Sequence, residues 1–538
     1  MSILNQPETP VVPMQPRRLF LLNAARLAAA STAATSSLLQ AAPSNAAGYP
    51  FSLGVASGAP LPDSVILWTR VLADPLSAAP LPPLAYTLRW EVAHDEAFRQ
   101  IVAQGSAVAA PELAHSVRVD VKGLQPARWY RYRFLLGDAV SPAGRTRTAP
   151  AAGSMPDMLK LAVASCQHWD FGSYAAHRYL AAANPDLVAF LGDYIYEWGA
   201  YRLQHPPRAV RQDESFTLSE YRRRYAHYKT DPDLQAAHRV APWIVTWDDH
   251  EVSNDYAADR DERLSPTFAQ RRAAAYQAFY EHMPLRLPPP RSFASVRMFQ
   301  RYDWGRLARF HVLDDRQYRA YEACPHPGMG GSNSVTPRAC PALLDPRRTM
   351  LGGEQEAWLA EGLASSKARW NILAQQTLMA QSSQVPVTAP DGGRYWTDGW
   401  DGYPIARRRL LDSIAASRAA NPLVLGGDVH TFYATELRRD VLRPVSKANP
   451  LVATEFVGTS VTSNSRPQQR TAQFVAMNPH IRYGRSDRRG YMLLEVTPKE
   501  TRTRFMGLDE VRDPKTAQRE LAAFRVVDGK VGVEVMSV

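Results

Sequence analysis

Short segments with a strand-like pattern of apolar and polar residues fill the chain from residue 50 to residue 148. The clearest are SVILWTRV, AYTLRWEVA, HSVRVDVKGL and ARWYRYRFLL, and Pro, Gly and Asp residues separate them. No segment of comparable strength has a helical period. We therefore predict an all-β, immunoglobulin-like sandwich over residues 50–148, followed by a Pro-, Gly- and Ala-rich linker over residues 149–157.

Continuous apolar runs and helix-like segments alternate beyond the linker, in residues 158–505. The runs of strand length are LKLAVASC, DLVAFLGD, WIVTWDDH, RWNILAQQ and PLVLGGDVH. Because they are continuously apolar, they predict strands buried on both faces, as in a layered α/β domain. One helix-like segment, SPTFAQRRAAAYQAFYEHM, opens with a Ser-Pro helix start. The remaining residues, 506–538, include the segment FRVVDGKVGVEV, which predicts a C-terminal hairpin.

Residues 1–46 carry the pattern of an export signal. Arg17 and Arg18 precede a mildly apolar, Ala-rich stretch, and small residues follow with a cleavage point after Ala46 or Ala47. The paired arginines resemble a twin-arginine signal, whereas the alternative is an amphipathic N-terminal helix of the mature fold. We expect the twin-arginine export machinery to be a partner. We also expect export to the periplasm or the medium, and no membrane span in the mature protein.

Composition and charge narrow the function only partly. The chain has 538 residues, of which 45% are apolar and 21% charged, so it predicts a globular protein of two or more domains. The formal charge of +11 favours an anionic partner such as nucleic acid, a membrane surface or a phosphorylated substrate. The basic residues are scattered, however, and no nucleic-acid motif is present. We therefore expect no sequence-specific nucleic-acid binding, and the charge is compatible with phosphate substrates.

Residues able to bind a metal follow four of the apolar runs in the second domain. These residues are Cys166, Asp193, the cluster Asp248, Asp249 and His250, and the pair Asp428 and His430. The stretch TWDDHEVSND could instead be a solvated acidic turn or the start of a helix, and a single Cys or His is usually structural. The carboxyl ends of strands in α/β sheets are nevertheless where ligand sites collect. Clustered acids are also costly unless they share cations, so the recurrence predicts a metal site.

The residue types at these strand ends suit two different kinds of metal ion. Thiolate, phenolate and imidazole ligands favour a transition metal, and carboxylate oxygens favour a harder cation. In LGDYIYE, Asp193 and Tyr196 are three residues apart, so one turn could present both side chains inward. A carboxylate can bridge two metals, and paired metals activate water and stabilise phosphoryl transfer. The chemistry of the pattern is therefore compatible with a pair of metal ions of the kind that supports phosphoryl transfer.

Several longer segments resemble one known family. PFSLGVASG, VILWTR, ASCQ, LGDYIYE, WDDHE, LDDRQYR, DGWDGYP, GGDVH and EFVGTSVTS are similar to segments of the PhoD family of alkaline phosphatases and phosphodiesterases. They occur in family order over roughly residues 50–500. The resemblance implies an N-terminal β-sandwich and a metallophosphatase-like α/β domain, a layered β-sandwich flanked by helices. Ala59 departs from the family pattern, but it lies in the N-terminal β domain.

The resemblance also implies a site with Fe(III) and Ca(II). The implied iron ligands are Cys166, Asp193, Tyr196 and His430. Asp193 would bridge to the calcium ion, with Asp249, Asp428 and Asp248 as the other calcium ligands. His250 occupies the position of the histidine beside the scissile phosphate, so we assign it a catalytic role in stabilising the transition state or protonating the leaving oxygen.

Arg316 is a candidate for a phosphate contact, because a guanidinium fork matches phosphate oxygens. The alternative is a structural ion pair with Asp314 or Asp315.

These residues predict a secreted, metal-dependent phosphoesterase that hydrolyses phosphate monoesters or diesters with metal-activated hydroxide. The hydroxyl-rich segment GTSVTSNS offers no nucleophile elbow, so we expect no covalent serine chemistry. Two alternatives remain open: a non-catalytic, metal-stabilised surface or binding protein, and a phospholipase D-like phosphodiesterase of the same family. An iron oxidoreductase is less favoured, because the three-residue facial triad is absent.

The three cysteines are expected to divide by role. Cys324 and Cys340 bracket a Gly-, Ser- and Pro-rich loop in a chain that we expect to be exported, where disulfides persist. We predict a disulfide between them, and the alternative is two unpaired core thiols. Cys166 should remain unpaired as a metal ligand.

Overall fold

The computed structural model describes residues 48–77, 79–199, 208 and 213–537, which belong to one compact unit. The predicted twin-arginine signal lies outside these residues. Helices of the described part are α2 (Ala175–Ala182), α3 (Leu218–Lys229), α4 (Pro232–Val240), α5 (Phe268–His282), α6 (Gly352–Ala364), α7 (Pro404–Ser417) and α8 (Gln468–Met477). Short 3-10 turns are η1 (Pro111–Leu113), η2 (Trp169–Phe171), η4 (Pro341–Leu344) and η5 (Trp400–Gly402).

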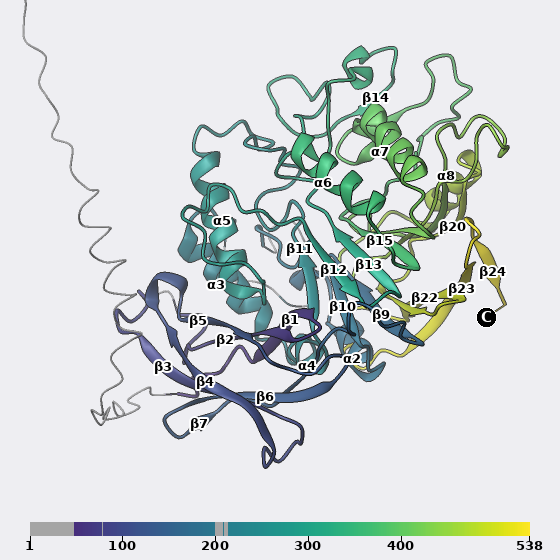
Figure 1. The fold of residues 1–538 in the computed structure, drawn as a ribbon. Coiled ribbons are helices and arrows are strands. Elements are labelled where there is room, and N and C mark those ends of the chain that lie inside the picture. The colour runs from purple at the N-terminus through teal and green to yellow at the C-terminus, as the bar shows by residue number, and fades with distance from the viewer. Residues whose placement is uncertain (1–47, 78, 200–207, 209–212, 538) are drawn as a thin grey trace, which may run out of the picture. The chain divides into compact units, whose positions relative to one another are not determined.

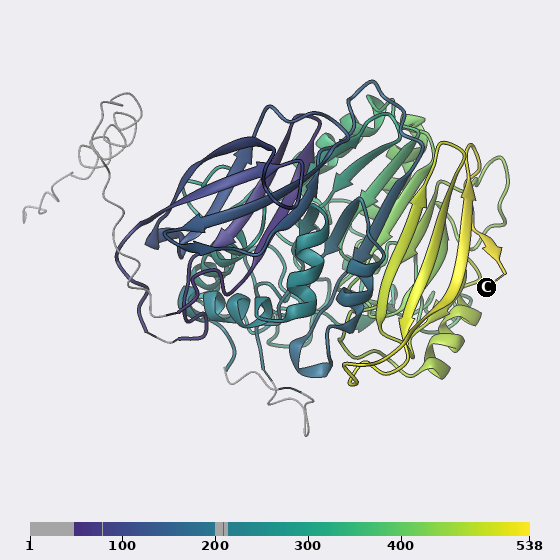
Figure 2. The same cartoon turned by 90° about the horizontal axis from the view of Figure 1, so that it is seen from below.

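The larger sheet crosses the whole described unit. Its order is β24 (Glu534–Met536), β23 (Gln518–Val527), β22 (Glu500–Leu508), β21 (Gly490–Val496), β9 (Leu159–Ala164), β10 (Leu187–Leu191), β11 (Trp243–Thr246), β1 (Val55–Leu61), β2 (Ser64–Arg70) and β5 (Ser116–Val121). β9, β10 and β11 are parallel neighbours, so their carboxyl ends share one edge. Figure 2 shows the first strands of the chain in purple and the last in yellow at opposite ends of this sheet.

A second sheet packs face to face with the larger one. Its order is β12 (Gln300–Trp304), β13 (Ala308–Val312), β15 (Trp370–Ala374), β17 (Pro422–Gly426), β19 (Ala453–Val457), β18 (Phe432–Leu437) and β20 (Ile481–Arg485). Buried side chains such as Leu161 and Ala189 from the larger sheet meet Phe310, Ile372 and Leu425 from the second. This apolar layer is why the strands are apolar on both faces, and it confirms the predicted layered sandwich.

Helices cover the outer faces of both sheets. α2, α3, α4 and α5 contribute to an apolar cluster against β10 and β11, with Tyr221, Leu234 and Phe279 among its buried members. α6 and α7 cover the second sheet through residues that include Leu359 and Leu411. Figure 1 shows α3 and α5 beside β11, and α6 and α7 on the side of β15. The architecture is therefore helix, sheet, sheet, helix.

The N-terminal strands form a smaller β-sandwich that shares a sheet with the rest. Its second sheet contains β4 (Ile101–Ala109), β3 (Tyr86–Ala93), β6 (Trp129–Leu136), β7 (Ala139–Val140) and β8 (Gly144–Arg147). This sheet packs on β1 and β2 through a core that includes Val65, Leu88 and Tyr132. β1 joins β11 where Gly58 lies opposite Trp243, and a Cβ at Gly58 would come within 2.7 Å of the Trp243 and Pro284 carbonyl oxygens. The absence of a side chain at Gly58 allows the two parts to meet.

The C-terminal strands extend the larger sheet. β23 and β24 pair as an antiparallel hairpin, with Arg525 opposite Glu534, and the turn includes Gly529 in a left-handed conformation. β22 runs through residue 505, so the last segment continues the sheet of the α/β domain. The domain boundaries at residues 149–157 and 505 stay predictions.

Lys229, at the end of α3, is a buried cation with an unusual environment. It is 1% exposed, and its Nζ lies 4.3 Å from the centroid of the Trp68 ring and 3.5 Å from His238 Nε2. Burial lowers the pKa of Lys229 from 10.5 to about 7.

Stability should therefore depend on pH through Lys229. Between about pH 7 and pH 10 the unfolded chain holds a proton that the folded chain has released, so the free energy of unfolding should rise with pH across this window. Below about pH 7 the full cost of burying the charge is present. We expect Lys229→Met to raise the unfolding midpoint at pH 7 and to flatten this rise, as measured by thermal unfolding across the window. Parallel curves for the variant and the wild type would contradict the assignment.

Candidate metal centre

The predicted metal ligands meet where strands of both sheets end. Cys166, Asp193 and Asp248 each lie two residues beyond β9, β10 and β11, and Asp428 lies two residues beyond β17 of the second sheet. The backbone N–H of Cys166 donates to Gly192 O at 3.1 Å, which ties the first two loops together. Both sheets therefore point their carboxyl ends at the same place, as expected for a ligand site in an α/β fold.

Three overlapping groups of side chains could each hold a cation. Within each group the potential ligand atoms lie within 4.8 Å of one another: Cys166, Asp193 and His430; Asp193, Asp249 and His250; and Asp248, Asp249 and Asp428. Asp193 belongs to the first two groups, and Asp249 belongs to the last two. The geometry is that of neighbouring sites joined by shared carboxylates.

Tyr196 adds a phenol to the first group. Its Oη donates to Asp193 Oδ2 at 2.8 Å and lies 3.1 Å from His430 Nε2. Ser463 Oγ lies 2.7 Å from the same phenol oxygen, and His430 Nδ1 is 2.6 Å from Asn464 O. These contacts from the loop after β19 orient the phenol and the imidazole toward the shared space.

The backbone at this site is held in conformations that L-residues seldom adopt. The φ angles are 60° at Cys166, 57° at Asp193, 59° at Asp428 and 52° at His430, all in the left-handed region. Such residues persist only where the surroundings fix them, and they cluster at functional sites. Gly192 has φ 106°, and a Cβ there would come within 2.5 Å of Asp248 Cβ. Only glycine lets the loops after β10 and β11 approach this closely.

Glu251 fixes those two loops, a role that the sequence did not reveal. Its carboxylate accepts hydrogen bonds from the backbone N–H groups of Asp193 at 3.0 Å, Tyr194 at 2.5 Å and Asp248 at 2.8 Å. Burial raises the pKa of Glu251 to about 7, although these hydrogen bonds favour the charged form. The motif WDDHE contains this residue, but a buried acid that receives only backbone donors has no distinct sequence pattern.

The site has an electrostatic need for cations. Asp193 Oδ1, Asp248 Oδ2 and Asp249 Oδ1 are buried and accept no hydrogen bond from any described residue. Burial, with the neighbouring acids, raises the pKa of Asp193 and of Asp248 well above the usual range. Burial also raises the pKa of Asp428 to about 6. Cations would offset the cost of these buried charges, so the oxygen atoms fit a metal.

The first group also has the right chemistry for a softer ion. Burial lowers the pKa of His430 to about 3, so its imidazole is neutral and able to ligate. Burial and the charge of Asp193 raise the pKa of the Cys166 thiol, which a bound cation would reverse. Cys166 is an unpaired thiol, as the sequence predicted.

Arg316 lies among the carboxylates. It is 1% exposed, its Nε donates to Asp248 Oδ1, and its Nη1 donates to Asp398 Oδ1 at 2.6 Å. Its Nη2 lies 3.5 Å from Asp249 Oδ1. The guanidinium therefore anchors the third group, Asp248, Asp249 and Asp428, by ion pairs with partners that differ from the anticipated Asp314 and Asp315, and its predicted contact with phosphate stays a prediction.

His250 is held by a second acid that the sequence reasoning missed. His250 Nδ1 lies 2.7 Å from Glu197 Oε2, and the His250 ring stacks on Tyr196 with centroids 4.1 Å apart. Burial opposes protonation of the imidazole, but the charges of Asp249, Glu197 and Asp193 prevail and raise the pKa of His250. Glu197 thus favours a proton on Nδ1 and fixes the direction of the ring. It follows Tyr196 directly in GDYIYE, yet nothing in the sequence links it to His250.

We expect Glu197→Gln to lower kcat for phosphoester hydrolysis by about a hundredfold, with little change in KM or metal content. The amide keeps the shape but cannot balance a positive imidazole. Steady-state kinetics with metal analysis measures this, and Glu495→Gln, which removes an acid paired with Arg504 at 3.1 Å outside the site, is the control. Equal kcat values for Glu197→Gln and Glu495→Gln would contradict the role of Glu197.

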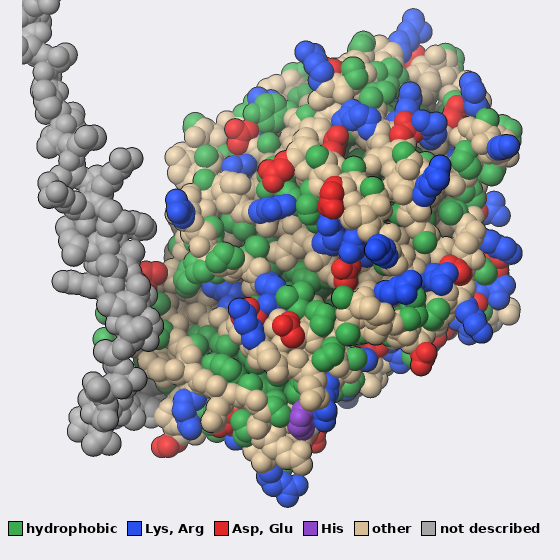
Figure 3. All heavy atoms as spheres, in the orientation of Figure 1, with side chains coloured by type: hydrophobic (Ala, Val, Ile, Leu, Met, Phe, Trp, Pro, Cys, Tyr) green, Lys and Arg blue, Asp and Glu red, His purple; other side chains and the backbone are tan. Residues whose placement is uncertain are grey.

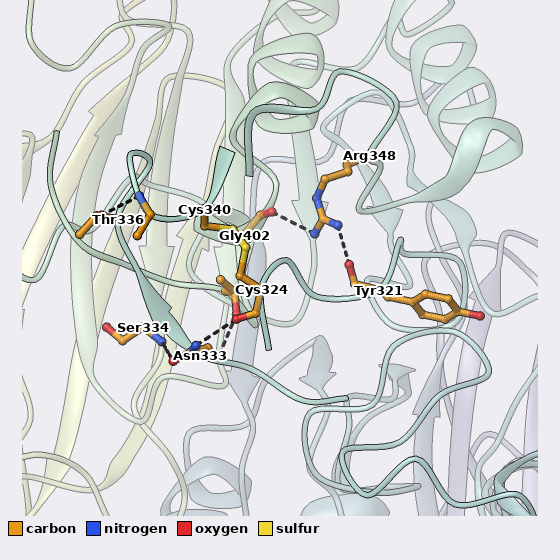
Figure 4. The surroundings of a disulfide bond; sticks show 10 residues. Tyr321, Cys324, Asn333, Ser334, Thr336, Cys340, Arg348 and Gly402 are labelled. Atoms are coloured by element: carbon orange, nitrogen blue, oxygen red, sulfur yellow. Dashed lines mark hydrogen bonds between the residues drawn. A yellow bond between two sulfur atoms is a disulfide. The ribbon is translucent and has the colours of Figure 1, made fainter. Parts of the chain in front are cut away.

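The predicted disulfide between Cys324 and Cys340 is present, with a separation of 16 residues. Figure 4 shows it beside β14 (Ser334–Val335), where Asn333 Nδ2 donates to Cys324 O at 2.9 Å. β14 pairs with β16 (Tyr395–Trp396). Closing a loop of this length stabilises the fold by about 3 kcal/mol in the chain-entropy model.

No helix among the described residues is both long and apolar enough to cross a membrane. Figure 3 shows that Lys and Arg side chains are scattered and interspersed with acids over the face in view.

A layered α/β sandwich that gathers acids, a thiol, a phenol and imidazoles at its strand ends is the arrangement expected of a metal-dependent phosphoesterase. Comparison with known sequences agrees. The sequence profile of the PhoD-like phosphatase family matches residues 161–505, and that of the PhoD-like phosphatase N-terminal domain matches residues 34–150. The chain belongs to the PhoD-like phosphatase family and is a phosphatase-type hydrolase, which confirms the resemblance and the predicted enzyme class.

The similarity to two individual relatives covers nearly the whole chain. It is 41% identical over 535 residues to alkaline phosphatase D of Bacillus subtilis (strain 168), with 97% of this chain and 89% of that protein covered. The solved structure described as PhoD superposes with a TM-score of 0.86 at 41% identity, covering 92% of this chain and 94% of the other.

Proposed function

We propose that this protein hydrolyses phosphate monoesters or diesters at a centre that holds Fe(III) and Ca(II). The observation that carries the proposal is the position of Asp193, which belongs to two ligand groups and has a buried Oδ1 without a hydrogen-bond donor among the described residues. A carboxylate in this position can bridge two cations.

The two ions differ in the ligands that support them. Cys166, Tyr196 and His430 offer thiolate, phenolate and neutral imidazole, which favour iron over calcium. Asp249, Asp428 and Asp248 offer oxygen atoms, which suit calcium. Thr377 Oγ1 donates to Asp428 Oδ2 at 2.6 Å, so one oxygen of this carboxylate is oriented by the protein.

The side chains around the ions would stabilise charge, transfer a proton and hold the ligands in position. When bound, the cations would activate water at neutral pH and neutralise negative charge on the phosphate. His250, held by Glu197, is placed to stabilise the developing charge or to protonate the leaving oxygen. Asp255 N donates to Asp249 Oδ2 at 2.7 Å, and Arg316 fixes Asp248, so neither carboxylate needs to reorganise during the reaction. The paired His250 and Glu197 favour an enzyme over a metal-stabilised binding protein.

We also propose export by the twin-arginine route. The supporting observations are Arg17 and Arg18 in the sequence and the Cys324–Cys340 disulfide, which is typical of an oxidising compartment. A variant with lysine at positions 17 and 18 should accumulate inside the cell, and normal secretion of this variant would contradict the route.

Removal of calcium tests the proposed function directly. Because calcium exchanges readily from oxygen ligands and iron is held by thiolate and phenolate, a calcium chelator should abolish hydrolysis while iron stays bound. The assay is release of p-nitrophenol from p-nitrophenyl phosphate and its bis ester, with and without added calcium, alongside elemental analysis. Activity that survives complete removal of calcium, or that zinc alone restores, would contradict the metal assignment. No hydrolysis under any metal condition would favour the binding protein.

A further inference from the structure

A cavity of about 430 Å³ opens beside the candidate metal centre, and the proposed function assigns no ligand to it. Its wall includes Asp428, a predicted calcium ligand, and Thr377, which holds that carboxylate. The volume lies within the ordinary range for small-molecule sites. A group in this cavity would therefore be adjacent to a phosphate placed at the metals.

Most of the cavity wall is apolar and aromatic. The apolar side chains are Leu378, Trp396, Trp400, Val429, Tyr433 and Phe474. Trp396 is 46% exposed, although tryptophan usually lies largely buried. An exposed indole at the wall of such a cavity offers a flat surface on which a planar ring can stack.

Two cations line the same cavity. Arg466 lies two residues before α8 and Arg470 lies in its first turn, and neither guanidinium forms an ion pair with another described residue. Arg466 Cζ lies 5.0 Å from the centroid of the Phe474 ring. The other carboxylate in the wall, Asp401, is engaged by Arg407 Nη1 at 2.5 Å. The two arginines are therefore available to a negatively charged ligand.

The position of Trp396 is fixed by the fold. In β16 it lies opposite Ser334 of β14, and Ser334 also lines the cavity. The disulfide lies beside β14, as Figure 4 shows for Ser334 and Cys324. Thr397 N donates to Asn333 O at 2.9 Å, and Asn333 N donates to Thr397 Oγ1 at 2.8 Å. Strand pairing and these hydrogen bonds therefore hold Trp396 in place before a ligand binds. This order reduces the conformational entropy that is lost on binding.

We propose that this cavity is a specificity subsite for the organic part of the phosphate ester. The ligand that it fits has a planar, apolar ring, which stacks on Trp396, and a second anionic group, which Arg466 and Arg470 bind. This inference rests on the proposed function, because the scissile phosphate is placed at the metal centre. Trp396 and the two arginines would then determine which esters are preferred.

Three esters of primary alcohols separate these contributions from leaving-group chemistry. Ethyl phosphate has no ring, benzyl phosphate has the ring, and 4-carboxybenzyl phosphate has the ring and a second charge that cannot be hydrolysed. For the metal-loaded protein we expect kcat/KM to rise about tenfold from ethyl to benzyl. A further rise of about threefold is expected from benzyl to 4-carboxybenzyl.

Substitutions should affect two ratios of kcat/KM separately: benzyl phosphate to ethyl phosphate, and 4-carboxybenzyl phosphate to benzyl phosphate. Trp396→Ala should remove the preference for benzyl over ethyl, and Trp396→Phe should restore most of it. Arg466→Gln and Arg470→Gln should remove the preference for the carboxylate while the benzyl preference stays. Arg482→Gln, at an exposed position of β20 outside the cavity wall, is the matched control and should change neither ratio. Equal rates for the three esters in the wild type, or unchanged ratios in Trp396→Ala, would overturn the subsite.

A binding measurement keeps the subsite separate from the proposed function. Calorimetry with 4-carboxybenzylphosphonate, which cannot be hydrolysed, should show about tenfold weaker binding to Trp396→Ala than to the wild type. This result would support the subsite even if no ester were hydrolysed, which would contradict the proposed function alone. Equal affinities would overturn the subsite even in an active enzyme.

Discussion

Asp193→Asn is expected to lose both metal ions and essentially all phosphoester hydrolysis. Asp193 belongs to two of the ligand groups, and an amide carries no charge and ligates more weakly. The decrease in kcat should be larger than the decrease of roughly 10²–10³-fold that follows removal of a single electrostatic contact to the transition state. Elemental analysis and hydrolysis of p-nitrophenyl phosphate by the purified variant measure both effects.

The matched control for this variant is Asp186→Asn. Asp186 is a partly buried acid that accepts from Lys160 N at 2.9 Å and pairs with Arg147, away from the centre. The Asp186→Asn substitution should lower the stability of the protein without changing its metal content. If Asp193→Asn keeps one ion at full occupancy, the two ions do not share this carboxylate.

Tyr196→Phe is expected to change the colour of the protein and to lose turnover. A phenolate bound to Fe(III) donates charge into the metal and produces a visible absorption, which calcium, magnesium or zinc cannot give. Removal of the phenolate also changes the Lewis acidity of the metal and the acidity of its water. Because Phe keeps the ring that stacks on His250, packing alone predicts almost no change.

Tyr194→Phe distinguishes a metal ligand from a buried tyrosine. Tyr194 is equally buried two residues earlier, and its Oη lies 2.7 Å from His238 Nε2, outside the ligand groups. The Tyr194→Phe substitution should leave both the visible spectrum and the rate of hydrolysis unchanged. A Tyr196→Phe protein with the spectrum and rate of the wild type would remove Tyr196 from the site.

The layered fold could be predicted because burial leaves a direct trace in the sequence. β9, β10, β15 and β17 lie between two layers, so they read as continuous apolar runs. The sharing of one sheet by the N-terminal and α/β parts could not be predicted. It depends on a contact between Gly58 and Trp243, and sequence pattern does not encode pairing between strands that are far apart.

The candidate metal ligands could be picked out from the sequence because they are reactive side chains placed directly after recognisable strands. The residues that orient them could not be. Glu251 acts through backbone N–H groups, Glu197 through His250, and Ser463 through Tyr196. Each of these contacts joins loops that the fold brings together, and each residue type is ordinary at its position. The ion-pair partners of Arg316 could not be predicted either, because Asp248 and Asp398 are distant from it in the sequence.

Anomalous scattering from crystals of the purified protein tests the two-metal centre most directly. Data collected on both sides of the iron edge should show one iron peak bounded by Cys166 Sγ, Tyr196 Oη and His430 Nε2. A lighter ion with oxygen ligands from Asp249 and Asp428 should lie beside it, with Asp193 bound to both. A centre that contains no iron, or a single ion that Asp193 does not ligate, would contradict the account.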